Sequence, residues 1–173
     1  MKSKRNIIWI IIVLIIGVYL FPSLKNRLAF AGSKPAIHER APEFSLEDIS
    51  GKKVHLSDFR EKVVLVNFWA SWCPPCKMEI PGFQKIYETY KDKGFTVIGI
   101  ATDDVPPSFM KSMGMTYPVA LADDKVISDY GNISGIPASF LVGRDGRIIK
   151  KVMGMYFEGG LKKDVENALK SRG

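Results

Sequence analysis

The sequence is poor in residues that bind metals or cross-link a fold. It contains two cysteines and two histidines among 173 residues. A structural zinc site takes four protein ligands, and His38 and His55 are not spaced to complete one with Cys73 and Cys76. A disulfide between cysteines so close together would stabilise the fold little, because that stabilisation grows with loop length. These shortages argue against a zinc protein and against a disulfide scaffold.

Acidic residues are absent from the first 31 positions, which hold five basic side chains: Lys2, Lys4, Arg5, Lys25 and Arg27. The rest of the chain holds 20 basic and 18 acidic side chains, so most of the net charge of +7 belongs to this leader. A nearly neutral domain lacks the basic footprint of nucleic-acid binding. We therefore expect no nucleic-acid partner.

The leader contains an uncharged apolar run, residues 6–24, between Arg5 and Lys25. A membrane-spanning helix needs about 20 such residues, so we expect an N-terminal transmembrane helix or signal-anchor within residues 1–31. The alternative is a cleaved signal peptide, since Ala29-Phe30-Ala31 resembles a cleavage site. We favour the uncleaved, single-pass anchor because the apolar run is long for a signal peptide. Both interpretations place the remaining chain on the extracytoplasmic side of the plasma (inner) membrane.

The chain after the leader divides into a linker and one domain. Residues 32–41 are polar and contain glycine and proline, which is typical of a linker, and residues 42–173 form the domain. Segment 44–59 has two short alternating runs around Ser50-Gly51, a pattern that predicts a β-hairpin.

Two nearly continuous apolar runs, 62–70 and 95–101, predict strands that are buried on both faces. Between them, segment 74–91 repeats apolar residues with the spacing of a half-buried helix. Such a β–helix–β unit places the domain in the α/β class.

Weaker patterns complete the expected domain. Short helices are predicted at 106–113 and 124–130, and a final amphipathic helix at 158–171. Strands are predicted at 117–121, 138–143 and 147–152. Asp145-Gly146 between the last two predicts a hairpin with a type I′ turn.

The two cysteines lie where a buried strand ends and a helix begins. Unpaired N–H groups and the positive end of the helix dipole stabilise a thiolate there, and the thiolate is the attacking species. Cys73 is therefore our candidate nucleophile, and Cys76, one turn further, the resolving thiol. Pro74 and Pro75 suit the first helical turn but remove N–H donors from the Cys73 thiolate. A less stabilised thiolate makes a better electron donor, so we expect a reductant.

With these elements in place, the chain resembles the thioredoxin superfamily, and within it the membrane-anchored TlpA/ResA-type thiol–disulfide oxidoreductases. The motif W-C-x-x-C followed by x-x-E-x-P and the later segment GIPASFLVGRDGRI carry the resemblance, which extends over about 41–169. It implies a thioredoxin-like fold, in which helices flank a central mixed sheet with an N-terminal β-hairpin and an αβ insertion.

The resemblance also implies roles for individual residues. Glu79 matches the family's glutamate that tunes the proton chemistry of the thiols, while Asn67 replaces the buried aspartate of cytosolic thioredoxins. Pro137 matches the cis-proline that faces the disulfide, which turns the Ile136 backbone toward a substrate segment. The remaining expected substrate contacts are Trp72, Pro74 and Pro75.

The family's substrates are disulfides in exported proteins, often apocytochrome c before haem attachment, and its electrons come from a membrane thiol-transfer protein. Its redox centre is the Cys73–Cys76 disulfide, with no other cofactor. The alternative is a Cu(I)-binding chaperone of the same fold, suggested by thioether ligands at Met110, Met113, Met115, Met153 and Met155. Peroxiredoxin-type chemistry needs proline and Thr or Ser where this chain has Val66 and Ala70, so we reject it.

Overall fold

The computed structural model describes residues 35–171. The predicted anchor over residues 1–31 and its cleavage motif lie outside this part of the chain. Within residues 35–171, no helix combines the length and the apolar character that crossing a bilayer requires.

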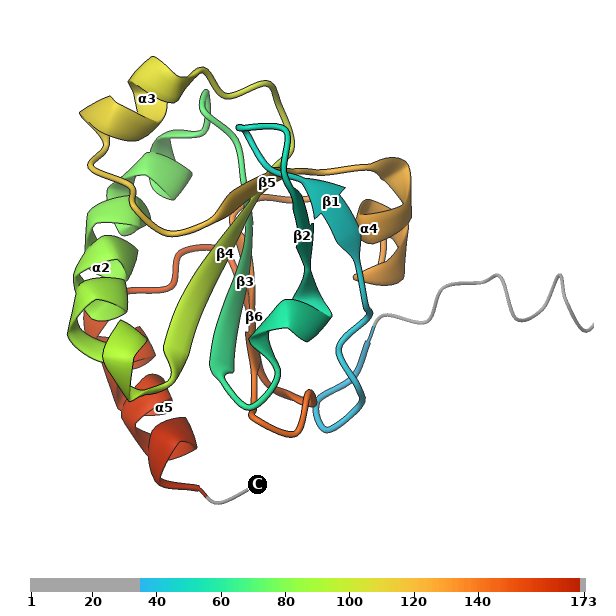
Figure 1. Cartoon of the computed structure of the whole chain (residues 1–173), viewed down its shortest axis with the longest axis vertical. Helices are drawn as coiled ribbons and strands as arrows, with labels where there is room; N and C mark the ends of the chain where they lie inside the picture. The colour runs from blue at the N-terminus through green and yellow to red at the C-terminus, as the bar shows by residue number, and fades with distance from the viewer. Residues whose placement is uncertain (1–34, 172–173) are drawn as a thin grey trace, which may run out of the picture. The chain divides into compact units, whose positions relative to one another are not determined.

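A five-stranded mixed sheet forms the centre of the domain, as the thioredoxin resemblance implied (Figure 1). Four of the five strands run in the same direction, and the fourth strand in spatial order runs antiparallel to both of its neighbours. In spatial order the strands are β5 (Val119–Leu121), β4 (Phe95–Ala101), β3 (Val63–Trp69), β6 (Ala138–Val142) and β7 (Ile148–Met153).

The predicted β–helix–β unit is confirmed. Every residue of β3 and β4 is buried, which agrees with their nearly continuous apolar sequences. Helix α2 (Pro74–Tyr90) connects them, and Phe83, Ile86 and Tyr90 on its apolar stripe are buried. The parallel pairing brings the ends of β3 and β4 to one edge of the sheet, where α2 begins.

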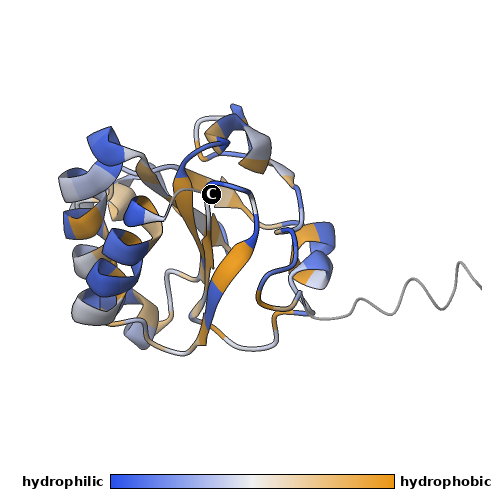
Figure 2. Cartoon of the chain, turned by 90° about the horizontal axis from the view of Figure 1, so that it is seen from below, coloured by the Kyte–Doolittle hydropathy of each residue, from blue (hydrophilic) through white to orange (hydrophobic). Residues whose placement is uncertain are grey.

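Helices cover both faces of the sheet (Figure 2). On one face, α2 and α5 (Glu158–Lys170) contribute residues such as Ile80 and Leu161 to a core with Leu65. On the other face, α4 (Asp124–Asp129) and the N-terminal hairpin pack on Val66 and Phe68. Helix α3 (Pro107–Ser112) follows β4 and belongs to the αβ segment inserted before β6.

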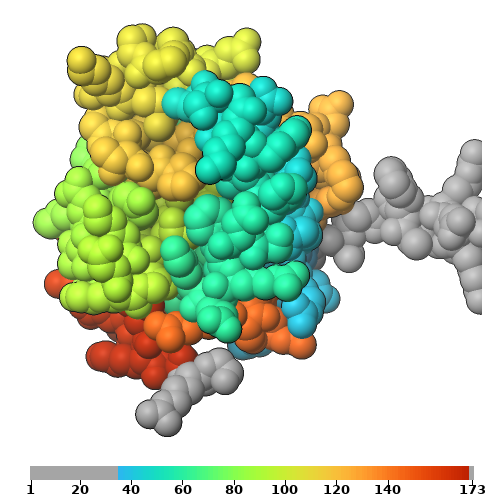
Figure 3. All heavy atoms as spheres, in the orientation of Figure 1, coloured from blue at the N-terminus to red at the C-terminus, as the bar shows by residue number. Residues whose placement is uncertain are grey.

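The predicted N-terminal hairpin is also confirmed. Strands β1 (Ser45–Glu47) and β2 (Lys53–His55) pair antiparallel and continue into the 3-10 helix η1 (Leu56–Phe59). The amide of Ile49 donates to the carbonyl of Val119, which attaches the hairpin to edge strand β5. In Figure 3 the hairpin and η1 cover the middle of the visible face, beside α2.

Two local expectations need correction. Strand β5 begins at Val119 rather than at residue 117, because Pro118 has no N–H for the ladder. The turn between β6 and β7 is not type I′, since positive φ occurs at Gly146 but not at Asp145. The Gly146 amide donates to the carbonyl of Gly143 at 2.9 Å and closes the turn, and the Asp145 carboxylate also accepts a hydrogen bond from the Arg147 amide.

The segment assigned to the linker contacts the domain at its C-terminal end. The amide of Ala41 donates to the carbonyl of Gly146, and His38 and Glu39 exchange backbone hydrogen bonds with Ile148. These bonds extend the sheet edge beside the start of β7.

Candidate active site

The cysteine pair lies at the junction of β3 and α2, as its sequence context predicted. Cys73 is the N-cap of α2, and its amide donates to the carbonyl of Ala70 at 3.2 Å, which closes the turn after β3. Pro74 and Pro75 occupy the first helical positions. The first amide that reaches the Cys73 sulfur is that of Cys76, at 3.3 Å. This single N–H is the local hydrogen-bond support for a thiolate at Cys73.

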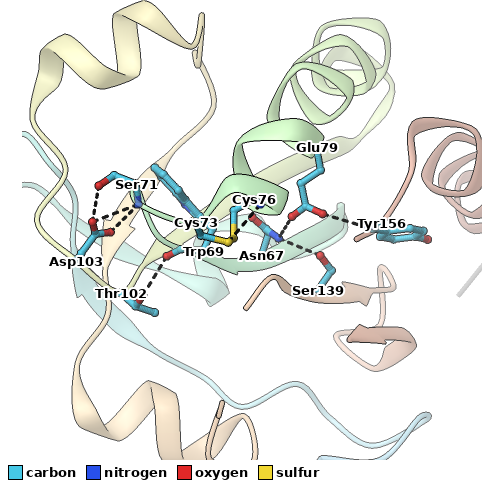
Figure 4. Close-up of a disulfide and its surroundings, with 10 residues drawn as sticks. All are labelled: Asn67, Trp69, Ser71, Cys73, Cys76, Glu79, Thr102, Asp103, Ser139 and Tyr156. Atoms are coloured by element: carbon cyan, nitrogen blue, oxygen red, sulfur yellow. Dashed lines mark hydrogen bonds between the residues drawn. A yellow bond between two sulfur atoms is a disulfide. The ribbon is translucent and has the colours of Figure 1, made fainter. Parts of the chain in front are cut away.

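The two cysteines form a disulfide in the structure (Figure 4). Cys73 is 3% exposed and Cys76 is fully buried, so an incoming sulfur reaches Cys73 first. Because the bond lies at a helix N-terminus, breaking it leaves Cys73 in an environment that favours the thiolate.

A buried polar network surrounds Glu79. One carboxylate oxygen accepts a hydrogen bond from the Asn67 side-chain amide at 2.9 Å, and the other accepts from the Tyr156 backbone amide at 3.0 Å. The Asn67 amide also donates to the Ser139 hydroxyl at 3.0 Å. The network therefore joins β3, α2, β6 and the loop before α5.

Burial raises the pKa of the Glu79 carboxyl to about 7, against the opposing effect of the hydrogen bonds from Tyr156 and Asn67. Glu79 and Cys76 are three residues apart on α2 and both are buried, so they share the inner face of the helix. Figure 4 shows the carboxylate beyond Cys76, between Asn67 and Tyr156. A carboxyl group with a pKa near neutrality can both accept and donate a proton.

The sequence analysis missed a second carboxylate at the site, Asp103, which follows β4. Its oxygens accept hydrogen bonds from the Ser71 amide at 3.0 and 3.2 Å and from the Ser71 hydroxyl at 2.5 Å. Thr102 adds amide and hydroxyl bonds to the Trp69 carbonyl. These contacts hold the turn before Cys73 against the end of β4. The signal available in the sequence was an aspartate two residues after the end of a strand that is parallel to the cysteine-bearing strand.

We expect Asp103→Ala to lower the free energy of unfolding by about 1–2 kcal/mol, because the Ser71 amide and hydroxyl lose their acceptors. Asp103→Asn retains one acceptor oxygen and should lose less. Urea denaturation measures both, with Asp104→Ala as the matched control because Asp104 is exposed. Equal losses of unfolding free energy for Asp103→Ala and Asp104→Ala would contradict the role of Asp103 in holding the turn before Cys73.

The two tryptophans beside the cysteines have different environments. Trp69 is fully buried and stacks on Phe109 with ring centroids 5.7 Å apart. Its indole N–H is the only buried side-chain polar atom without a hydrogen-bond partner in the described chain. Trp72 is largely exposed next to Cys73. Trp69 is therefore a core residue, while Trp72 is available to a partner.

The Ile136–Pro137 peptide bond is cis, which confirms the geometry that the resemblance implied. Strand β6 starts at the next residue, Ala138, which pairs with Phe68 near the end of β3. The proline therefore lies at the same edge of the sheet as the cysteines. Its carbonyl accepts a hydrogen bond from the Gly154 amide at 2.8 Å.

This fold and its Cys-x-x-Cys disulfide define a thiol–disulfide oxidoreductase of the thioredoxin fold. The sequence pattern of the AhpC/TSA family matches residues 37–151, and the chain belongs to that family. Its curated relatives include the thiol–disulfide oxidoreductase ResA of Bacillus thuringiensis, 34% identical over 94% of this chain and 98% of the relative. ResA of Bacillus subtilis is also 34% identical, over 91% and 90% of the two chains.

Solved structures agree with these relatives. A thiol:disulfide interchange protein of the thioredoxin family from Chlorobium tepidum is 34% identical and superposes with a TM-score of 0.71. The similarity covers 78% of this chain and 98% of that structure. The chain is thus a ResA-like enzyme that exchanges thiols and disulfides.

Proposed function

We propose that the enzyme reduces disulfides in exported proteins, with Cys73 as the attacking thiol and Cys76 as the resolving thiol. The observation that carries the assignment is the difference between the two sulfurs. Cys73 caps α2, is 3% exposed, and its sulfur accepts a hydrogen bond from the Cys76 amide, whereas Cys76 is fully buried.

The proposed reaction transfers two electrons to the substrate. In the reduced enzyme, the Cys73 thiolate attacks one sulfur of a substrate disulfide, and a mixed disulfide forms as the other substrate sulfur leaves and takes up a proton. Cys76 then loses its proton and attacks the Cys73 sulfur. The enzyme disulfide forms, and the second substrate cysteine leaves as a thiol. A separate thiol donor must reduce the enzyme again.

The first turn of α2 supports the reducing direction. Pro74 and Pro75 have no N–H group that could donate to the Cys73 sulfur. The Cys73 thiolate is therefore stabilised by the dipole of α2 and by the hydrogen bond from the Cys76 amide. A reduced form with limited thiolate stabilisation has a lower potential and donates electrons more readily.

We assign Glu79 as the group that exchanges a proton with the thiols, most directly with buried Cys76. A carboxylate is the base that Cys76 needs before it attacks Cys73, and the neutral carboxyl can return the proton in the reverse step. Asn67 cannot titrate, so in this chain it holds the Glu79 carboxyl by a hydrogen bond instead of exchanging a proton itself.

The substrate is proposed to bind over the cysteine turn and the cis-proline. Trp72, Pro74 and Pro75 present apolar surface around Cys73. The backbone of Ile136 before Pro137 pairs with an extended substrate segment in the manner of an added strand.

We place this activity outside the cytoplasm, on a domain tethered by the N-terminal anchor. The leader supports this placement, and the names of the ResA relatives support the redox chemistry. The proposed partners are exported disulfide proteins, including apocytochrome c, and a membrane thiol-transfer protein as the electron donor. The chemistry needs the Cys73–Cys76 pair and no bound cofactor.

The copper alternative receives no support from the methionines in the described domain. Met110 and Met115 are buried in the core on the α2 face, where methionine commonly fills gaps. Met153 is exposed at the end of β7, on a different element.

A trapping experiment tests the proposed function. Cys76→Ala removes the resolving thiol, so mixed disulfides between Cys73 and its partners should accumulate in cells. Non-reducing gels and mass spectrometry identify those partners, and Cys73→Ala, the control, should trap none. Failure to trap any exported protein, or equal trapping through Cys76 in Cys73→Ala, would overturn the assignment.

A further inference from the structure

The loop between β7 and α5 contacts two parts of the active site through its backbone. The Gly154 amide donates to the carbonyl of Pro137 at 2.8 Å, and the Tyr156 amide donates to the Glu79 carboxylate at 3.0 Å. A backbone amide orients a buried carboxylate only while the loop that carries it keeps its position. Any contact that fixes this loop therefore also fixes the Glu79 carboxyl.

The side chain of Tyr156 ties the loop to α5 and β7. Tyr156 is 5% exposed, and its hydroxyl donates to the Asp164 carboxylate, in the middle of α5, at 2.6 Å. The same carboxylate oxygen pairs with Lys150 of β7 at 3.2 Å. In Figure 4 the Tyr156 backbone faces Glu79, and the ring extends away with its hydroxyl at the far end. One residue thus joins the Glu79 carboxyl to an ion pair on two other elements.

The bond between Tyr156 and Asp164 is built to persist at neutral pH. Burial, the hydrogen bond to Asp164 and the charge of Asp164 all raise the pKa of the Tyr156 hydroxyl, so it stays protonated and donates. A hydrogen bond to a carboxylate is roughly twice as strong as one between neutral groups. Because Lys150 balances the charge of Asp164, this anchor adds little net charge near Glu79.

We propose that Tyr156 and Asp164 are positioning residues for thiol–disulfide exchange: Asp164 holds the Tyr156 side chain, and the Tyr156 amide holds the Glu79 carboxyl. The inference rests on the proposed function, because it explains how the group that exchanges the proton is kept in place. Both residues act through Glu79, so their effect depends on the presence of its carboxyl group.

The other titratable neighbours of Glu79 do not carry a charge that would mask this effect. Cys76 lies on the same helix and belongs to the reaction itself. Tyr117 faces Glu79 from the segment before β5, and burial, followed by the charge of Glu79, raises the pKa of its hydroxyl, so it stays neutral. Asn67 and Ser139 complete the network and do not titrate near neutral pH.

The expected result is a shift of the pH–rate profile to higher pH. The Tyr156 amide stabilises the charged form of Glu79 and lowers its pKa, so a loop without its anchor should let that pKa rise. In Asp164→Ala the midpoint of the profile should move up by about one pH unit, which lowers the rate at pH 7 about fivefold. Single-turnover oxidation of the reduced full-length enzyme by 2-hydroxyethyl disulfide measures the profile.

The sign of the shift separates positioning from a simple charge effect. Removing the negative charge of Asp164 without moving the loop would lower the pKa of Glu79 and shift the profile to lower pH. Asp164→Asn keeps an acceptor oxygen for the Tyr156 hydroxyl and should retain the wild-type profile within about 0.3 pH units. Tyr156→Phe removes only the hydroxyl and should reproduce the upward shift of Asp164→Ala.

Glu158→Gln is the matched control, because it breaks another ion pair of α5, with Lys85 at 2.7 Å, and should leave the profile unchanged. In the Glu79→Gln background, Tyr156→Phe should change the rate less than about twofold. A further fivefold loss there would overturn the inference, as would a wild-type profile for Tyr156→Phe. An effect of Glu79→Gln without one of Tyr156→Phe would remove the positioning role alone, whereas an enzyme that reduces no disulfide would contradict the proposed function.

Discussion

Glu79→Gln should slow thiol–disulfide exchange by about 10²-fold and remove the change in rate near pH 7, because the variant has no carboxylate to take the proton from Cys76. The raised pKa of the Glu79 carboxyl, about 7, places this change in rate near neutral pH. Single-turnover rates from pH 5 to pH 9 measure it. A wild-type profile that rises through pH 7 and a flatter variant profile are the expected result.

The same substitution also has a predicted effect on stability. The Glu79 pKa is raised from an ordinary value of 4.5 to about 7, so the folded state binds this proton more tightly than the unfolded state. Its contribution to stability is therefore fully present below pH 4.5 and is lost as the pH rises through 7, by about 1–3 kcal/mol. Glu79→Gln should remove this loss.

Glu88→Gln on the same helix is the control, and it should leave both the rate profile and the pH dependence of stability unchanged. If Glu79→Gln retained the wild-type pH–rate profile, the Glu79 carboxyl would have no part in proton exchange, and its role would be limited to holding Asn67 and Tyr156.

Gly99→Val should lower the free energy of unfolding by about 3 kcal/mol, because the position has no room for a side chain. A Cβ atom there would lie 2.9 Å from the indole nitrogen of Trp69 and 3.2 Å from a methyl group of Val119. The indole is fully buried and stacked on Phe109, so it cannot move away without disturbing the core. Thermal and urea unfolding measure the loss.

Gly159→Ala provides the control, since no atom lies near a Cβ at that position in α5. Alanine should preserve stability there or raise it by a few tenths of a kcal/mol, because it favours helix more than glycine does. Should Gly99→Val unfold at the same urea concentration as the wild type, the close approach of Trp69 to β4 would be wrong.

The elements that could be predicted from the sequence are those with a strong local pattern. Strands β3 and β4 are apolar at nearly every position, and α2 repeats its apolar residues with helical spacing. Both patterns arise because the side chains of a strand or a helix point to a given face at a fixed spacing. Residues close together in the sequence are therefore sufficient to recognise them. The placement of Cys73 at the start of α2 follows directly.

Contacts between residues far apart in the chain could not be predicted in this way. The Tyr156 amide reaches Glu79 across 77 positions, and Asp103 reaches Ser71 across 32. The periodicity of the sequence does not predict these contacts, because they depend on how strands and loops meet at one edge of the sheet. Even the burial of Trp69 and the exposure of Trp72 depend on where β3 ends.

The sequence by itself determined the α/β class, the position of the reactive cysteine pair and the apolar leader, because each depends on neighbouring residues. Only the tertiary structure decided the surroundings of the sulfurs. It buried Glu79 between Asn67 and Tyr156 and bound Ser71 to Asp103. The physical reason is that burial and hydrogen bonding in a site are set by segments that meet only when the chain folds.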